Sequence, residues 1–232
     1  MHRTVNTIAL SVIVALTLVA CAAPIPDSAP TPTAAPPAAS GTPSPTAPVD
    51  PATLPSAVRI GAESVDIVSA DDTVITSLSY TSDAAAAVAA LTGILGDPTE
   101  ATHLDDTPNT YPADVTTWGG FAIAVYHTGP DAPVVEDPYL VGNFRVVATS
   151  TSATSEITVA SADGTQIGDD FATTAADSAP DDVQLNPGGT SIVMLSAQTS
   201  SPGHRYGVVG VTGEGTETIE RIGAPSYIFS VV

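Results

Sequence analysis

The sequence predicts an α+β fold in which a mostly antiparallel β-sheet carries one clear helix, with a tandem duplication of a β-hairpin–helix–strand unit. Three observations lead to this prediction: an alanine-rich segment with helical periodicity, apolar and polar residues that alternate with a period of two, and an acidic turn motif that occurs twice. The acidic globular domain is expected over residues 56–232, with repeat units over 60–150 and 151–232. A chain of this length buries about 70% of its unfolded surface.

The alanine-rich segment at residues 84–95 has helix signals at both ends. Thr81 or Ser82 can act as the N-cap, and Asp83 favours the positive end of the helix dipole. The sequence Gly-Asp-Pro at residues 96–98 then ends the helix. Because alanine side chains are small, this helix can lie close against a sheet. Its apolar face consists of Val88, Leu91 and Leu95.

Most other segments are predicted to be strands. Residues 65–69 and 73–80 flank a tight turn at Asp71 and Asp72, and the stretch 121–126 alternates large apolar residues with alanine and tyrosine. A hairpin turn is expected at the Gly-Glu-Gly sequence of residues 213–215. Further strands are expected at residues 144–149, 156–161, 191–197, 206–212, 216–222 and 227–232.

The segment at residues 65–75 has a partner 92 residues later, at 157–167. In both, a strand is followed by a Ser-Ala-Asp turn and a second strand, and then by an aromatic residue (Tyr80 or Phe171) and an alanine-rich helical segment. The second helical segment is short, from residue 173 to about 178, because a proline follows at position 180. The pattern favours duplication. The alternative is that acidic hairpins resemble one another by chance in a chain of biased composition.

Residues 1–20 have the three parts of a secretory signal peptide. Arg3 supplies the positive charge, residues 8–20 are almost uninterruptedly apolar, and small residues flank the cleavage site. The apolar run of about 13 residues is shorter than the roughly 20 that a spanning helix needs, so a cleaved signal is favoured over a retained membrane anchor.

The end of this run, Leu18-Val19-Ala20-Cys21, resembles a bacterial lipobox. The resemblance implies cleavage between Ala20 and Cys21 and a diacylglyceryl thioether, carrying palmitate-like acyl chains, on the Cys21 sulfur. The alternative is that cleavage occurs elsewhere, for example after Ala23. Since Cys21 is the single cysteine of the chain, a disulfide framework, a zinc site and a cysteine nucleophile are all excluded from the mature domain.

Residues 21–55 are rich in proline, alanine and threonine and are expected to form a disordered linker after the lipidated N-terminus. A fully polyproline-like linker of this length reaches on the order of 100 Å. The formal net charge is −20, and all five basic residues counted are arginines. Such a charge excludes nucleic acid as a partner. Solubility is the favoured reason for the charge, and loose capture of divalent or other cationic ligands is the alternative.

The motifs of serine hydrolases, zinc proteases, P-loops and dinucleotide-binding folds are absent, so no catalytic residue, metal ligand or cofactor is assigned. His103 with Asp105 and Asp106 offers one nitrogen and two carboxylates, but a solvated loop is the favoured interpretation. The pairs 169–170 and 181–182 are interpreted as helix-start and turn carboxylates rather than a calcium site. For Trp118 a role in the core is the favoured interpretation, and a ligand- or partner-facing role is the alternative. In that alternative, Trp118 and Tyr126 are candidates for ligand binding, which Tyr111 and Tyr139 could join.

The body resembles uncharacterised actinobacterial secreted lipoproteins that have a hairpin, an isoleucine-or-valine–glycine–aspartate step and a helix. The residues that carry this resemblance are 165–170, 91–98 and 118–121. More remotely, tandem units of a helix followed by antiparallel sheet look like the β-lactamase inhibitory proteins and small envelope-assembly lipoproteins.

We therefore expect a lipoprotein anchored through Cys21 to the extracytoplasmic face of the cell membrane, with a non-catalytic module that binds an envelope protein or wall component. The alternatives are a hydrolase whose site is not visible in the sequence and an inhibitor of a secreted enzyme.

Overall fold

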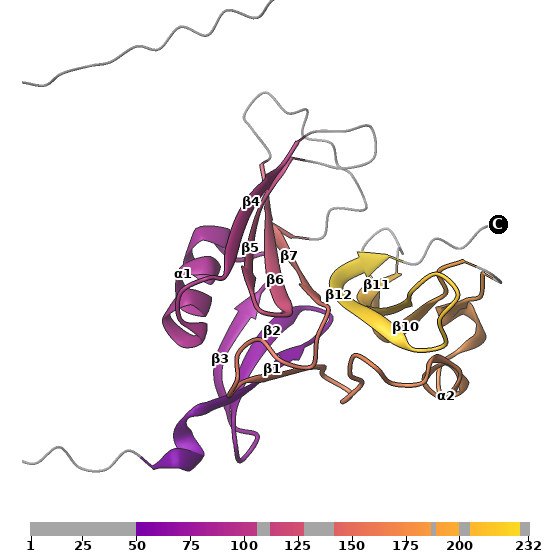
Figure 1. Cartoon of the computed structure of the whole chain (residues 1–232), viewed down its shortest axis with the longest axis horizontal. Coiled ribbons are helices and arrows are strands. Elements are labelled where there is room, and N and C mark those ends of the chain that lie inside the picture. Colours follow the sequence, from indigo (N-terminus) through magenta and orange to yellow (C-terminus); the bar gives the residue numbers. More distant parts are fainter. Residues whose placement is uncertain (1–49, 106–111, 128–141, 187–188, 200–204, 228–232) are drawn as a thin grey trace, which may run out of the picture. The chain divides into compact units, whose positions relative to one another are not determined.

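A computed structural model describes residues 50–105, 112–127, 142–186, 189–199 and 205–227. The chain divides into two compact units, Met1–Thr46 and Ala47–Val232. All of the described residues belong to the second unit (Figure 1). The predicted signal peptide, Cys21 and most of the predicted linker lie outside the described residues. Within the described residues, the structure contains no helix that combines the length and apolar character needed to cross a membrane.

The described part of the chain forms two β-sheets, which confirms the α+β prediction of mostly antiparallel sheet with one clear helix. The first sheet has the strand order β3-β2-β1-β8, and the second has the order β4-β5-β6-β7-β12-β11-β10-β9. In chain order, the elements are η1 (Pro51–Thr53), β1 (Pro55–Ile60), β2 (Ser64–Ser69), β3 (Val74–Ser79), α1 (Ala84–Leu95), β4 (Glu100–Leu104), β5 (Ala113–Trp118), β6 (Phe121–Tyr126), β7 (Phe144–Ala148), β8 (Thr158–Ser161), α2 (Phe171–Ala176), η2 (Pro180–Asp182), β9 (Val183–Gln184), β10 (Ile192–Thr199), β11 (Arg205–Thr212) and β12 (Ile219–Tyr227).

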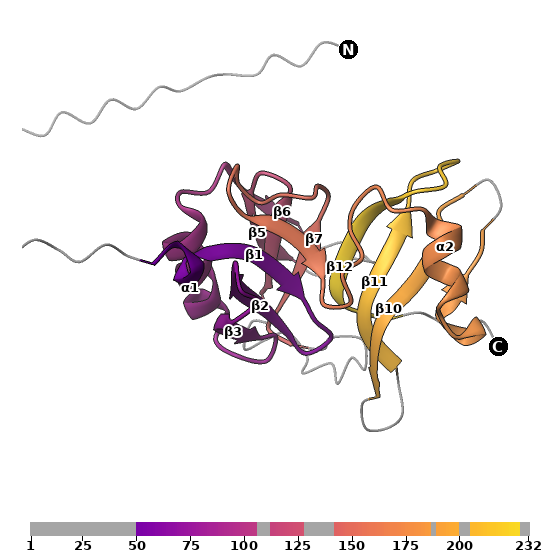
Figure 2. The same ribbon diagram turned by 90° about the horizontal axis from the view of Figure 1, so that it is seen from below.

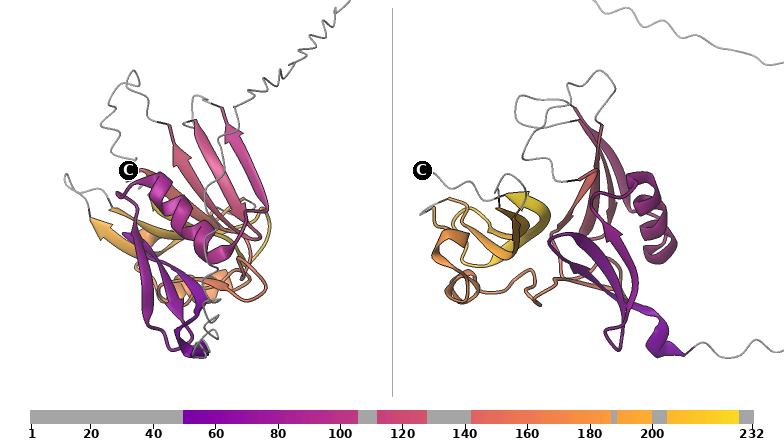
Figure 3. Two further views of the ribbon diagram at one scale, coloured as in Figure 1. Left: turned by 90° about the vertical axis from the view of Figure 1, so that its left-hand side faces the viewer. Right: turned by 180° about the vertical axis from the view of Figure 1, so that it is seen from behind.

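The eight-stranded sheet consists of two antiparallel meanders, β4–β7 and β9–β12. Their last strands, β7 and β12, pair with each other over three residues, so that the order of the second meander mirrors that of the first. A helix precedes each meander in the chain. Helix α1 lies along the β4–β7 meander (Figure 3), and α2 contacts β10 of the other meander (Figure 2).

Helix α1 begins at Ala84, as predicted, but its cap differs from the prediction. The Asp83 carboxylate accepts a hydrogen bond from the Ala86 backbone N–H at 2.8 Å, so Asp83 is the N-cap in place of Thr81 or Ser82. Aspartate both satisfies an unpaired backbone donor and places a negative charge at the positive end of the helix. Gly96, with φ of 83°, ends the helix in a conformation that favours glycine.

The two Ser-Ala-Asp segments form the same turn. In the first, the Ser69 hydroxyl donates to the Asp71 carboxylate, which also accepts from the Thr73 backbone N–H. Residues 161, 163 and 165 repeat these two contacts. The position before the threonine has positive φ in both turns, 61° at Asp72 and 96° at Gly164.

The second copy departs from the prediction after this turn. Strand β3 follows the first turn, whereas no strand lies between residue 165 and α2, where a second strand was predicted. Instead, the Gly168 and Phe171 backbone N–H groups donate to the carbonyls of Ile219 and Glu217. Helix α2 then occupies Phe171–Ala176 and begins two residues before the predicted segment.

The two halves of the chain do not form separate sheets among the described residues. Strand β1 pairs antiparallel with β2 on one side and parallel with β8 on the other, so β8 of the predicted second unit joins the sheet of the first. One core cluster contains residues from both sheets and both helices, including Ile60, Leu91, Trp118 and Phe171.

Four strands, β1, β4, β5 and β9, were not predicted, and β1 includes Pro55, which had been placed in the linker. The segments predicted separately at 216–222 and 227–232 correspond to one strand, β12, as far as Tyr227, and the remaining residues lie outside the described ranges. Residues 223–226, which separated the two predicted segments, are part of this strand. The pairing of β12 with both β7 and β11 holds this segment extended.

Candidate functional site

Three polar side chains meet on one face of the sheet formed by β4, β5 and β6. His103 on β4 is the direct cross-strand partner of Asp114 on β5, and Asp114 is in turn opposite Val125 on β6. His127 follows β6 two residues after Val125, and its backbone N–H donates to the Pro112 carbonyl at 2.9 Å. Because side chains two residues apart along a strand share a face, His127 lies on the same face as Asp114.

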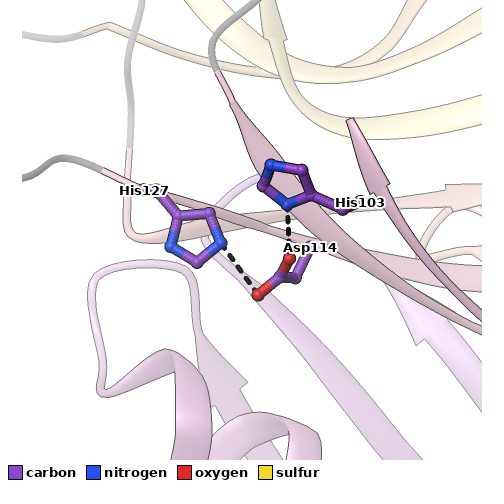
Figure 4. Close-up of side chains that lie close together, drawn as sticks. All are labelled: His103, Asp114 and His127. Atoms are coloured by element: carbon purple, nitrogen blue, oxygen red, sulfur yellow. Dashed lines mark hydrogen bonds and ion pairs between the residues drawn. The ribbon is translucent and has the colours of Figure 1, made fainter. Parts of the chain in front are cut away.

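The carboxylate of Asp114 lies between the two imidazoles (Figure 4). Asp114 Oδ1 is 2.8 Å from His103 Nδ1, and Asp114 Oδ2 is 2.8 Å from His127 Nε2. The ring centroids of the two histidines are 5.6 Å apart. All three side chains are about half exposed, with relative accessibilities of 52%, 57% and 47% for His103, Asp114 and His127. We call these three residues the His–Asp–His cluster.

The electrostatics of the cluster favour an ionised carboxylate. The hydrogen bond from His103 lowers the pKa of Asp114 below its ordinary value by more than desolvation raises it, and the hydrogen bond and charge of His127 lower this pKa further. Since an ionised carboxylate only accepts hydrogen bonds, His103 Nδ1 and His127 Nε2 are the protonated donors of this arrangement. Asp114 therefore presents one oxygen to each ring.

Asp114 and His127 stand on the face of the sheet that carries buried apolar residues elsewhere along β5 and β6. On β6, Phe121 and Ile123 are fully buried, Val125 packs against the core, and the next residue of the same face is His127. On β5, Trp118 is buried, and Asp114 lies four residues before it on the same face. Polar side chains in an otherwise apolar register mark a functional or strained position.

Trp118 belongs to the core, as the favoured interpretation predicted, and it lies at the opposite end of the β5–β6 hairpin from Tyr126, the other candidate for ligand binding. Trp118 pairs with Phe121 beside the turn, and Tyr126 pairs with Ala113 at the far end. The indole of Trp118 is 1% exposed, and its Nε1–H donates to the Gly96 carbonyl at 2.9 Å. It also lines a cavity of about 460 Å³ beside Gly119 and Gly120. The hairpin register therefore separates the two residues, and Tyr111 and Tyr139 lie outside the described residues.

The predicted surroundings of His103 need correction. His103 was placed in a solvated loop with Asp105 and Asp106, but it lies on β4 and contacts Asp114. The group of potential metal ligands around it contains Asp114 and His127 and does not include Asp105. Asp106 lies outside the described residues. The expectation of no zinc site depended on the lack of further cysteines and did not consider histidine and aspartate ligands that are 11 and 13 residues apart in the chain.

The other acidic pairs lie at a helix start and in the 3-10 turn η2, as predicted, and the ion pair of Asp182 with Arg205 is an additional finding. Asp170 is the N-cap of α2, and the Asp169 carboxylate accepts from the Gln166 backbone N–H at 2.8 Å. The Arg205 guanidinium contacts both carboxylate oxygens of Asp182, with nitrogen–oxygen distances of 2.5 and 3.0 Å. A cavity of about 510 Å³ lies beside α2, and its acidic lining residues are Asp163, Asp169, Asp170 and Asp177.

One sequence signal could have located the His–Asp–His cluster. Gly119 and Gly120 separate two stretches of alternating residues, which is typical of a two-residue hairpin turn. Folding the chain at this turn pairs residue 114 with residue 125 and brings His127 beside Asp114. The position of His103 depends on β4, whose five residues are all exposed and give no apolar pattern.

Comparison with known proteins adds no assignment. No protein-family model, curated protein or solved structure matches this chain.

Proposed function

We propose that this chain is a lipoprotein anchored by a lipid on Cys21 to the extracytoplasmic face of the cell membrane, and that its compact unit is a non-catalytic binding module. The single observation that carries the proposal is the Leu18-Val19-Ala20-Cys21 sequence at the end of a short apolar run. The proline-rich segment that follows supports it, because such a segment holds a domain away from the membrane. The anchor requires two or more acyl chains, since one chain binds a bilayer only marginally.

Replacement of Cys21 by serine in the full chain tests the anchor. The wild-type protein is expected in the detergent phase, with a mature N-terminus at a lipid-modified Cys21. The C21S variant is expected to accumulate as uncleaved precursor or soluble secreted material. Ser28→Ala, a change of similar size within the linker, is the matched control and should partition like the wild type. Mass spectrometry that finds an unmodified Cys21, or a mature chain that begins elsewhere, contradicts the proposal.

The binding role is tested with the anchored full chain. We expect saturable association with isolated cell walls, or a single dominant crosslinked partner in intact envelopes. Extended sheet surfaces suit such a role because they present side chains in a fixed order. Absence of association in both experiments would overturn the binding role and leave the anchor unaffected.

A tandem duplication is part of the proposal. Each half of the compact unit contains a strand, the same Ser–Asp turn, an aspartate-capped helix and a four-stranded meander, and the meanders are arranged as mirror-ordered halves of one sheet. The missing strand between the second turn and α2 is the main difference between the copies. In its place, residues 168–171 form backbone hydrogen bonds with residues 217–219, whereas β3 of the first copy pairs with β2.

This architecture favours a second candidate function, inhibition of a secreted enzyme. Two helix-and-sheet units in tandem correspond to the remote resemblance to β-lactamase inhibitory proteins. The full chain should then inhibit a secreted hydrolase such as a β-lactamase at a one-to-one ratio. Undiminished hydrolysis at a large excess of the chain would remove this candidate.

A further inference from the structure

We propose that His103, Asp114 and His127 form a binding site for one divalent transition-metal ion, with Zn²⁺ as the representative ion. The proposal is independent of the lipid anchor because it depends only on side chains of the compact unit. The three residues offer two imidazole nitrogens and one carboxylate oxygen, and these donor atoms all lie within 4.8 Å of one another. Imidazole and carboxylate are the ordinary protein ligands of Zn²⁺.

The geometry needs only a small adjustment to accept an ion. Tetrahedral coordination at bond lengths of about 2.0–2.2 Å places neighbouring ligand atoms ~3.3 Å apart. The two nitrogen–oxygen distances are 2.8 Å, so each must widen by about 0.5 Å. Rotation of three half-exposed side chains can supply this change. The ion would replace the two protons that now bridge the rings to Asp114.

The backbone around the cluster is fixed by strand pairing. Strands β4 and β5 pair continuously over five residues, and β5 and β6 pair over six, with no irregularity in either register. Ligands on paired strands are held more precisely than ligands on loops. The partial exposure of all three residues leaves room for water or an external ligand at a fourth position, as in zinc sites with three protein ligands.

The chemistry of the donors also sets the selectivity. Ca²⁺ and Mg²⁺ bind almost entirely through oxygen, with six or more ligands for Ca²⁺, and two of the three donors here are nitrogens. Imidazole favours Zn²⁺, Ni²⁺ and Cu²⁺. The formal net charge of −20 raises the local concentration of any cation near the chain, but it does not distinguish between cations. We therefore expect millimolar Ca²⁺ to leave Zn²⁺ bound.

Titration of the full chain in detergent with ZnCl₂, followed by calorimetry, tests the site. One equivalent should bind saturably, in the presence and absence of excess Ca²⁺. Nuclear magnetic resonance of ¹⁵N-labelled histidines should show coordination through Nδ1 of His103 and Nε2 of His127, because these atoms face the carboxylate. Absence of saturable binding, or unchanged nitrogen shifts for both residues, would overturn the proposal without any variant.

Variants then locate the ion. H103Q, D114N and H127Q should each weaken Zn²⁺ affinity by at least about 10- to 100-fold. Loss of a residue that only hydrogen-bonds to a metal ligand already has an effect of this size, and these three residues would be ligands themselves. D177N, in the acidic cavity beside α2, is the matched control for charge, and H204Q, outside the described residues, is the control for histidine content. Both controls should bind Zn²⁺ like the wild type. Equal losses in D177N and D114N would show general attraction to an acidic surface and contradict the proposal.

Discussion

The two halves of the compact unit neutralise a carboxylate in different ways. In the second half, Asp182 is only 12% exposed and contacts both terminal nitrogens of Arg205, a permanent cation that cannot bind a metal. In the first half, Asp114 is 57% exposed and is shared between two histidines, whose nitrogens can carry a proton or a metal ion. One half of the compact unit therefore contains a fixed ion pair between η2 and β11, and the other half contains an exchangeable cluster on the β4–β6 sheet.

The largest expected effect concerns the core beneath the first meander. Trp118→Ala should lower the free energy of unfolding by about 3–5 kcal/mol, because it removes a buried ring and the hydrogen bond to Gly96. Phe171→Ala, at the start of the six-residue helix α2, should cost less, since Phe171 belongs to a shorter helix at the edge of the core. Urea unfolding of both variants measures the difference. A greater loss for Phe171→Ala would show that the second half determines stability.

The second effect concerns the fixed ion pair. Arg205→Ala should destabilise the protein by about 1–3 kcal/mol, because it leaves the largely buried Asp182 carboxylate without its cation. The double variant with Asp182→Asn should recover part of this loss, and thermal unfolding of the four proteins gives the coupling. D114N should change the unfolding temperature less than R205A. The reverse order would mean that the His–Asp–His cluster has mainly a structural role.

A smaller effect is expected at the two similar turns. Gly164 has φ of 96° and open space beside its Cα, and the equivalent residue of the first turn is an aspartate with φ of 61°. Gly164→Asp should therefore cost no more than about 1 kcal/mol, whereas Gly164→Val should cost more, since β-branched residues strongly avoid positive φ. Chemical denaturation distinguishes the two. Equal losses would indicate that the turns are less similar than their hydrogen bonds suggest.

The smallest effect at neutral pH is expected at the cap of α2. Hydrogen bonds from Thr173 lower the pKa of Asp170 below its ordinary value. Because the folded-state pKa is the lower one, the ionised cap contributes stability above the unfolded-state pKa of about 4, and this contribution is lost as the pH falls through the folded value. Asp170→Asn retains a capping side chain, so stability at pH 7 should change little while its dependence on pH below about 4 becomes flatter. If the melting temperature of the variant depends on pH between about pH 2 and 5 as steeply as that of the wild type, this prediction is contradicted.

The sequence predicted most of the elements whose signal is local. Helix α1 was located at the correct residues because its alanines, its preceding aspartate and its terminal glycine act within a few positions of one another. Strands with large apolar residues, such as β6 and β10, were also predicted. Strands β4 and β5 were missed because threonine, alanine and polar residues dominate them, and their conformation depends on pairing with a neighbour.

The candidate site shows the same difference between local sequence signals and pairing of distant segments. The residues of the His–Asp–His cluster were visible as individual histidines and carboxylates, but nothing local joined His103 to Asp114 or His127. Only the sheet register, with Asp114 between the other two, determined that they meet.

The amino-acid sequence by itself determined the class of fold, the acidic character of the chain, the repeated turn and the expectation of a lipid on Cys21, because each of these depends on composition or on neighbours along the chain. The tertiary structure decided how the meanders combine into one sheet, which strand joins β1 from the far half, and which polar side chains face one another. These features depend on pairing between distant segments, and a shift of one residue in register would turn Asp114 to the opposite face from His103.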